Sequence, residues 1–211
     1  MELQQLTEAV IAGDAPRAQA LAEAALAEAV APETIVNDGL IAAMHVVGER
    51  FGRGEVYVPE MLLSARAMQT CLTILEPLLA EQGSTSRGTV VLGTVKGDVH
   101  DIGKNIVGIM LKGSGFTVHD LGVDVPAERF VDAVREHEPD VLGLSALLTT
   151  TMPGMQTVID ALETAGVRDQ VKVLVGGAPV TEEFAASIGA DGYGRDAGVA
   201  ADKATELVAA R

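Results

Sequence analysis

Apolar residues recur at helical spacing through the first part of the chain. The apolar stripes run over residues 3–10, 18–29, 35–47 and 62–79, and turn-forming residues separate them. After the first stripe, Asp14 is a candidate N-cap for the second helix. Four helices with short connections predict an up-and-down helical bundle.

The pattern changes after residue 88. Short apolar runs bounded by turn residues now alternate with amphipathic stretches. This alternation predicts a flavodoxin-like (Rossmann-like) parallel sheet with helices on both of its faces. Strands are predicted at 89–95, 116–121, 140–145, 171–176 and 190–193, and helices at 103–114, 126–137, 153–166, 181–188 and 197–210.

A small, polar stretch separates the two patterns. Residues 83–88 are Gly-Ser-Thr-Ser-Arg-Gly, a composition typical of a flexible linker. The predicted fold class is therefore α + α/β, with a four-helix bundle cap domain over 1–82, the linker over 83–88 and an α/β domain over 89–211.

Composition narrows the function classes. A net charge of −15 opposes binding to nucleic acid or to an anionic membrane surface. Cys71 is the only cysteine, which excludes an internal disulfide and a cysteine-based zinc site. No stretch reaches the roughly 20 apolar residues of a membrane span, and the N-terminus lacks the features of a signal peptide. We therefore expect a cytoplasmic protein with neither nucleic acid nor membrane as a partner.

The loop after the first predicted strand carries the chemistry of most interest. Asp98 and His100 stand two residues apart, and a helical pattern begins at Gly103. Ligands of open α/β sheets bind at the carboxyl ends of the strands. Imidazole binds transition metals well, and a neighbouring carboxylate commonly orients the ring. The alternative is an Asp and a His in an ordinary polar loop. His119 and His137 stand at positions expected to lie on the surface.

Two further strand ends are rich in small residues and hydroxyls. Residues 143–151 end in three threonines, and Gly176 and Gly177 follow the fourth predicted strand. Such residues leave room for a ligand and supply hydrogen bonds to it. Ordinary turns that precede helices explain both segments almost as well.

The run Gly93–Asn105, with its Asp-x-His-x-x-Gly pattern, resembles the cobalamin domain of methionine synthase and the corrinoid proteins of methanol, methylamine and methoxy-aromatic methyltransferase systems. Gly122–Pro126 and Gly143–Ser145 strengthen the resemblance. It covers essentially the whole chain, because the family also carries an N-terminal helical cap, in which residues 51–60 match the segment over the corrin.

This resemblance implies roles for individual residues. His100 becomes the lower axial ligand to cobalt, Asp98 holds its ring, and Thr151 bonds Asp98. The further cofactor-binding residues are Gly97, Val99, Asp101, Ile102 and Gly103 in the loop, Ser145, Leu147, Thr149, Gly176, Gly177 and Ala197 at the other strand ends, and Phe51 and Val58 over the upper, methyl-bearing face.

The resemblance also implies a function. Such a protein binds cobalamin (vitamin B12) and carries a methyl group on cobalt, alternating between methylcobalamin and cob(I)alamin. Its partners are a substrate:corrinoid methyltransferase, a TIM barrel in this family, a second methyltransferase with tetrahydrofolate or coenzyme M as acceptor, and a reductive activator of the corrinoid. The chain shows no site for donor or acceptor, so a carrier subunit is expected rather than a complete enzyme.

Three alternatives remain at this point. A cobalamin-binding sensor would usually add a DNA-binding domain and a Trp in its cap, and this chain has no Trp. The small subunit of an adenosylcobalamin mutase has the His loop but lacks the helical cap. A flavodoxin-like protein without a corrinoid would purify colourless from medium that contains cobalamin.

Overall fold

The computed structural model describes residues 2–81 and 86–210 and divides the chain into two compact units. The first unit is Met1–Ser86 with Gly113–Gly115, and the second is Arg87–Lys112 with Phe116–Arg211. The predicted linker, 83–88, falls largely in residues 82–85, which lie outside the described residues. The predicted domain boundaries therefore stay a prediction, and each unit is described by itself.

The first unit is helical throughout its described part. Its helices are α1 (Glu2–Ile11), α2 (Ala15–Ala27), α3 (Pro32–Thr34), η1 (Ile35–Ile41), α4 (Ala42–Gly52) and α5 (Val58–Glu81). The carboxylate of Asp14 accepts a hydrogen bond from the Arg17 N–H at 3.1 Å, so Asp14 caps α2 as its position in the sequence predicted. Helix α2 packs on α1 and α5, and the core between the helices is aliphatic.

One turn of the third predicted helix is wider than an α-helix. Residues Ile35–Ile41 form a π-helix, η1, in which the Ala42 N–H donates to the Asn37 carbonyl. The Thr7 hydroxyl of α1 donates a hydrogen bond to the Gly39 carbonyl in this segment at 3.1 Å. A Cβ at Gly39 would lie 2.9 Å from Leu6 Cδ2, so glycine lets α1 approach closely.

The second unit contains a five-stranded sheet with the order β2-β1-β3-β4-β5, and all of the pairings are parallel. Its strands are β1 (Thr89–Thr94), β2 (Thr117–Asp120), β3 (Val141–Ser145), β4 (Lys172–Gly176) and β5 (Gly192–Gly194). This is the flavodoxin-like strand order, so the predicted fold class is confirmed.

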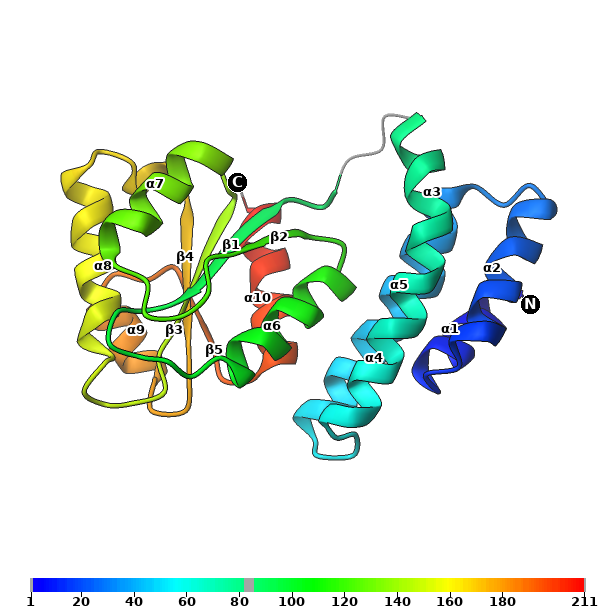
Figure 1. The fold of residues 1–211 in the computed structure, drawn as a ribbon, viewed down its shortest axis with the longest axis horizontal. Helices are drawn as coiled ribbons and strands as arrows, with labels where there is room; N and C mark the ends of the chain where they lie inside the picture. The colour runs from blue at the N-terminus through cyan, green and yellow to red at the C-terminus, as the bar shows by residue number, and fades with distance from the viewer. Residues whose placement is uncertain (1, 82–85, 211) are drawn as a thin grey trace. The chain divides into compact units, whose positions relative to one another are not determined.

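Helices cover both faces of the sheet. The elements between the strands are α6 (Ile102–Gly113), α7 (Ala127–His137), α8 (Pro153–Thr164), the short 3₁₀ helix η2 (Arg168–Gln170), α9 (Glu182–Ser187) and α10 (Ala197–Ala209). Helices α7, α8 and α9 lie on one face, and α6 and α10 lie on the other (Figure 1).

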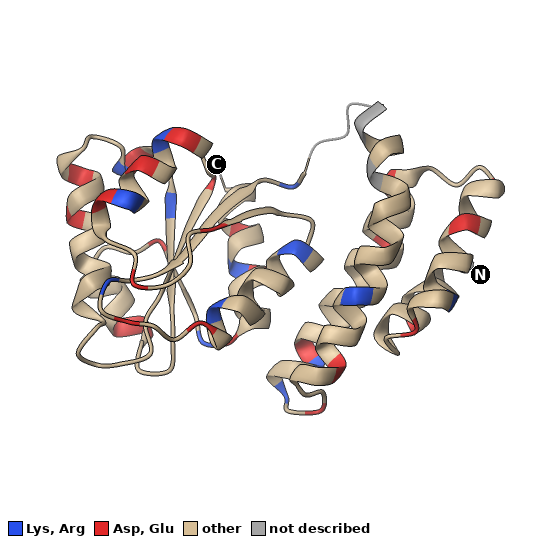
Figure 2. Cartoon of the chain, viewed as in Figure 1, with Lys and Arg blue, Asp and Glu red and all other residues tan. Residues whose placement is uncertain are grey.

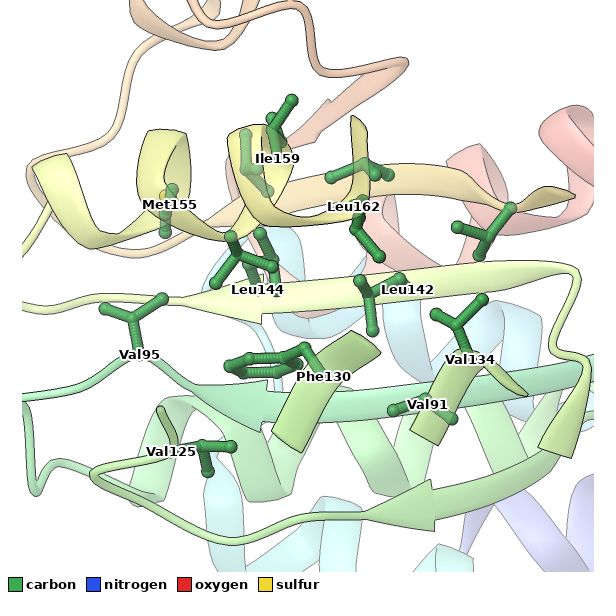
Figure 3. Packing of buried hydrophobic residues seen from close by; sticks show 14 of the residues in the cluster. Val91, Val95, Val125, Phe130, Val134, Leu142, Leu144, Met155, Ile159 and Leu162 are labelled. Carbon is green, nitrogen blue, oxygen red and sulfur yellow. The ribbon is translucent and has the colours of Figure 1, made fainter. Parts of the chain in front are cut away.

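The core beneath α7 and α8 is built from aliphatic side chains and one aromatic ring. Figure 3 shows Phe130 of α7 between Val91 of β1 and Leu144 of β3, with Met155 and Ile159 of α8 beyond them. A Cβ at Gly93 would lie 2.7 Å from the Phe130 ring, so the glycine makes room for that ring. This packing fixes β1 and β3 side by side, and with them the loops at their carboxyl ends.

Charged residues lie mainly on helices and loops in the described structure, and the strands carry few of them (Figure 2). The acidic residues are spread over both units (Figure 2). No helix in the described part of the chain is long and apolar enough to cross a membrane.

An ion pair joins the amino end of β4 to the residue before β5. The Asp191 carboxylate accepts hydrogen bonds from Arg168 Nη2 and from the Val173 N–H, both at 2.7 Å, and Lys172 Nζ lies 3.4 Å away. Burial alone would raise the pKa of Asp191, but these hydrogen bonds and the two positive charges outweigh it and lower the pKa.

Acid is therefore expected to weaken this contact. Because the pKa of Asp191 is lower in the folded chain than in the unfolded one, its stabilising effect is present above about pH 4 and is lost as the pH falls further. Asp191→Asn should lower the free energy of unfolding at pH 7 by about 1–3 kcal/mol. Its loss of stability between pH 5 and pH 3 should be smaller than the wild type's by up to about 1 kcal/mol, the most that one carboxyl can contribute over that range.

Urea unfolding of both proteins across that pH range measures the effect. Glu206→Gln is the matched control, because Glu206 pairs with Lys203 on the exposed side of α10. The control should leave stability nearly unchanged. Equal pH profiles for wild type and Asp191→Asn would contradict the assignment.

Candidate functional site

The loop that carries His100 lies where the strand order reverses. The chain runs from β1 to β2 on one side and then to β3 on the other side of β1. Residues 95–101 leave the carboxyl end of β1 here, beside the loop that leaves β3. In open α/β sheets, ligands bind at this switch point.

Asp98 is the buried centre of this loop. Its side chain is 0% exposed and accepts four hydrogen bonds. The donors are the His100 ring at 2.7 Å, the His100 N–H at 3.0 Å, the Leu147 N–H at 2.7 Å and the Thr151 hydroxyl at 2.7 Å. The carboxylate therefore ties the loop after β1 to the loop after β3.

These bonds also set the charge of Asp98. Burial alone would raise the pKa of the carboxyl, but the hydrogen bonds from Thr151, Leu147 and His100 together outweigh burial and hold the pKa well below its usual range. Asp98 is therefore a carboxylate at neutral pH, and it can act only as an acceptor.

The His100 ring is held at one nitrogen and open at the other. Its Nδ1 lies 2.7 Å from Asp98 Oδ1, and its side chain is 46% exposed. Since the carboxylate only accepts, Nδ1 carries the hydrogen and the Nε2 lone pair is left free. Nε2 has no hydrogen-bond partner among the described residues. This is the arrangement that a metal ligand needs.

Large apolar side chains are exposed in and next to the loops at this edge of the sheet. Val99 and Ile102, in the loop and at the start of α6, are 69% and 72% exposed. Leu147 and Leu148, in the loop after β3, are 43% and 42% exposed. Large apolar side chains exposed around a polar centre mark a binding surface. A flat, largely apolar macrocycle whose metal takes one nitrogen from the protein fits these residues.

Hydrogen bonds to backbone groups of the loop hold it in place. The Thr94 hydroxyl, fully buried, donates to the His100 carbonyl at 3.0 Å. The Asp124 carboxylate accepts a hydrogen bond from the Gly97 N–H at 2.7 Å. The backbone N–H of Asp124 donates to the Asp98 carbonyl at 2.9 Å. Gly97 has a φ of +85°, which glycine adopts without strain.

The other residues expected in the site are more dispersed. Ser145 ends β3 and is half-buried, while Thr149 lies exposed in the following loop. A Cβ at Gly177 would lie 1.9 Å from the Ala146 carbonyl oxygen, and one at Gly176 would lie 2.9 Å from the Gly194 carbonyl oxygen. These glycines therefore admit the protein's own backbone, and their contact with a ligand stays a prediction.

Ala197 is buried at the first position of α10. Asp101, Ile102 and Gly103 lead into α6 and begin it, and all three are exposed. In the other unit, Phe51 lies in the last turn of α4 and Val58 is the first residue of α5; both are half-buried. The structure thus brings Asp98, His100 and Thr151 together by direct hydrogen bonds. The roles of all these residues toward a cofactor stay predictions.

Sequence reasoning missed several participants in the loop. Thr94, Asp124 and the Leu147 N–H form hydrogen bonds that hold Asp98 and His100. A backbone donor leaves no trace in residue identity, so the Leu147 bond could not be foreseen. Asp124 lies in the loop that follows β2, and a polar residue in the loop after a strand was a usable signal for it.

His119 and His137, expected at the surface, make a contact with each other that was not predicted. Their rings stack with centroids 4.0 Å apart and an interplanar angle of 10°. His119 lies on β2 and His137 ends α7, and both are half-buried. The two residues are far apart in the sequence, so the sequence gives no sign that their rings stack.

Thr151 gives a direct test of the buried network. Its hydroxyl donates to Asp98 at 2.7 Å and lies 2.9 Å from the Leu148 carbonyl. Thr151→Val keeps the shape but removes the donor, so the folded protein should lose about 1–3 kcal/mol of stability. Thr151→Ser keeps the hydroxyl and should lose less. Urea unfolding at pH 7 compares the three proteins, and equal losses in the two variants would contradict a role for the hydrogen bond.

Comparison with known protein families confirms the resemblance seen in the sequence. Two family models match, each described as a B12 binding domain, over residues 88–202 and residues 2–76. The first covers the sheet unit with the His100 loop, and the second covers most of the helical unit.

Whole-length relatives agree with these matches. The dimethylamine corrinoid protein of Methanosarcina barkeri is 46% identical over 208 residues, which cover 98% of this chain and 97% of the relative. The trimethylamine corrinoid protein of the same organism is 45% identical over 198 residues, which cover 93% of this chain and 91% of the relative.

Two solved structures share the fold over nearly the whole chain. A cobalamin-binding protein from Desulfitobacterium hafniense DCB-2 matches with a TM-score of 0.83 at 33% identity, over 97% of this chain and 98% of that chain. The methanol:cobalamin methyltransferase complex MtaBC from Methanosarcina barkeri matches with a TM-score of 0.83 at 32% identity, over 100% of this chain and 80% of that chain. The chain therefore belongs to the B12-binding family of corrinoid proteins.

Proposed function

We propose that this corrinoid protein carries a methyl group between methyltransferases, with His100 as the lower axial ligand of its cobalamin. The observation that carries the proposal is the His100 ring, fixed at Nδ1 by a buried carboxylate and open at Nε2. When bound, cobalamin supplies a cobalt centre that accepts and releases the methyl group. The residues of this chain position that centre and shield it.

Asp98 acts through His100 in this proposal. By accepting from Nδ1, it selects the tautomer with a free Nε2 lone pair and makes that nitrogen a better donor to a metal. Thr151 and the Leu147 N–H keep the carboxylate from rotating away, because each donates to its second oxygen. The exposed Val99, Ile102 and Leu147 would contact the apolar parts of the corrin.

The remaining predicted residues have subsidiary roles. Ser145 and Thr149 would face the benzimidazole tail, with Gly176, Gly177 and Ala197 along its groove. Phe51 and Val58 would shield the methyl-bearing face when no partner is docked. These roles are those of a carrier: this chain would protect the methyl group, and a partner enzyme would supply the site where the methyl group reacts.

The relatives point to the partners and the substrate class. The names of the relatives include dimethylamine and trimethylamine corrinoid proteins, and one solved relative is a complex with a methanol:cobalamin methyltransferase. We therefore propose that this chain works with cognate methyltransferases and that methylated amines are the first donor class to test. A TIM-barrel donor enzyme, a second enzyme using tetrahydrofolate or coenzyme M, and a reductive activator complete the proposed system.

Loading and transfer test the proposal in sequence. Purified protein should bind hydroxocobalamin and methylcobalamin with one-to-one stoichiometry. Protein loaded with radiolabelled methylcobalamin should lose its label to coenzyme M or tetrahydrofolate only when a second methyltransferase is present. Failure to bind either corrinoid would contradict the proposal, as would label transfer that needs no partner enzyme.

A further inference from the structure

A buried lysine, Lys104, lies where the loop that carries His100 ends and α6 begins. Among the Asp, Glu, Lys, Arg and His residues whose burial the structure describes, Asp98 and Lys104 are the two that are buried. They stand on either side of His100, one before it and one in the first turn of α6. Removing a charge from water is costly unless it is paired, so a buried lysine at this place requires an explanation.

Lys104 has two partners. Its ammonium group forms an ion pair with the Asp120 carboxylate at the end of β2. It also donates to Asn105 Oδ1 at 2.7 Å. The Lys104 side chain is 2% exposed, whereas that of Asp120 is 43% exposed. The lysine is thus the member of the pair that depends on the contact.

One route leads from Lys104 to the residue after His100. By bonding Asn105 Oδ1, the ammonium group turns the amide so that Nδ2 faces Asp101. Asn105 Nδ2 donates to Asp101 Oδ2 at 3.2 Å, and the Asn105 N–H donates to the Asp101 carbonyl at 2.7 Å. Asp101 directly follows His100 in the chain, so its position limits that of His100.

A second route leads to the His100 carbonyl. The other oxygen of Asp120 accepts from the Gly122 N–H at 2.8 Å, and the Gly122 carbonyl accepts from the Thr94 N–H at 3.0 Å. The Thr94 hydroxyl then donates to the His100 carbonyl at 3.0 Å. The two routes start at one buried ammonium group and meet at the peptide between His100 and Asp101.

We propose that Lys104 is a positioning residue for His100, acting with Asp120 to hold the loop so that Nε2 stays in one place. The inference rests on the proposed function for the identity of the group that Nε2 meets. The holding of the loop itself belongs to this chain and can be measured without cobalamin.

Lys104→Met tests the proposal. Methionine fills the space of the lysine stem, and Asp120 can turn to water, so no charge is left buried and the fold should persist. In the cobalamin-free protein, amide hydrogen exchange in residues 99–103 should become about tenfold faster or more. With hydroxocobalamin bound, the visible spectrum should show that a larger fraction of the cobalamin lacks the imidazole ligand.

Two further variants separate positioning from general stability. Arg168→Met breaks the Arg168–Asp191 ion pair, which lies in the same unit at the amino end of β4. It should lower global stability but leave both the exchange of 99–103 and the spectrum unchanged. Asp120→Asn changes the half-exposed partner of Lys104 and should shift both readouts in the direction of Lys104→Met.

The outcomes are distinct. Exchange that accelerates evenly over the whole unit in Lys104→Met would overturn the inference, because the lysine would then be a general stabiliser. Unchanged exchange and an unchanged spectrum would overturn it as well. Wild-type protein that binds no cobalamin would contradict the proposed function, while the exchange measurement would still decide the role of Lys104.

Discussion

The His100→Ala protein is expected to bind hydroxocobalamin at least about 100-fold more weakly than the wild type. The substitution removes the nitrogen that would meet the metal, whereas changes to the partners of a metal ligand alone typically cost about 10–100-fold. The corrin can still contact the apolar side chains around the loop, so residual binding is expected. The spectrum of that residual complex should show no imidazole ligand.

A visible absorption titration measures both effects. His119→Ala is the matched control, since His119 lies in the same unit but stacks on His137. The control should bind like the wild type. Equal affinity and equal spectra for His100→Ala and the wild type would mean that another group holds the metal.

Loss of Asp98 should be the most destabilising change in the site. Asp98→Ala leaves the Leu147 N–H and the His100 N–H without their acceptor, while the Thr151 hydroxyl can still donate to the Leu148 carbonyl. Each unpaired donor costs about 1–3 kcal/mol, and partial relaxation reduces the sum, so a loss of about 3–5 kcal/mol is expected.

Urea unfolding at pH 7 tests this expectation, with Asp98→Asn beside it. Asparagine keeps the size of the side chain but places an NH₂ group where two donors converge. Asp98→Asn should therefore lower the free energy of unfolding clearly, but by less than Asp98→Ala does. Asp101, an exposed acid in the same loop, provides the control, because Asp101→Ala removes one weak side-chain bond at 3.2 Å. Losses of similar size for Asp98→Ala and Asp101→Ala would contradict the central place of Asp98.

The sheet unit could be predicted closely because local patterns determine its elements. The predicted strands at 140–145 and 171–176 are observed at Val141–Ser145 and Lys172–Gly176. Buried parallel strands leave uninterrupted apolar runs, and turn residues mark both of their ends. The Asp98–His100 loop was predicted for the same reason, since its place between a strand and a helix is visible in the sequence.

Features that depend on contacts distant in the chain could not be predicted. Burial of Lys104 follows from the approach of Asp120 on β2, and hydropathy alone places a lysine on the surface. The π-helix at Ile35–Ile41 was missed because a widened turn shifts the apolar stripe by about one residue, which is too small a change to recognise in a short apolar pattern. The Leu147 N–H donor to Asp98 is a backbone group, and no residue type signals it.

Electron paramagnetic resonance tests most directly whether His100 supplies the lower axial nitrogen. Protein is loaded with cobalamin, reduced to the cobalt(II) form, and compared with the same protein made with ¹⁵N-labelled histidine. If His100 is the ligand, labelling converts the nitrogen splitting of each cobalt line from a triplet to a doublet, and His100→Ala abolishes the effect. A triplet that persists in the labelled protein would show that a nitrogen outside histidine holds the metal, and would contradict the assignment of His100 as the axial ligand.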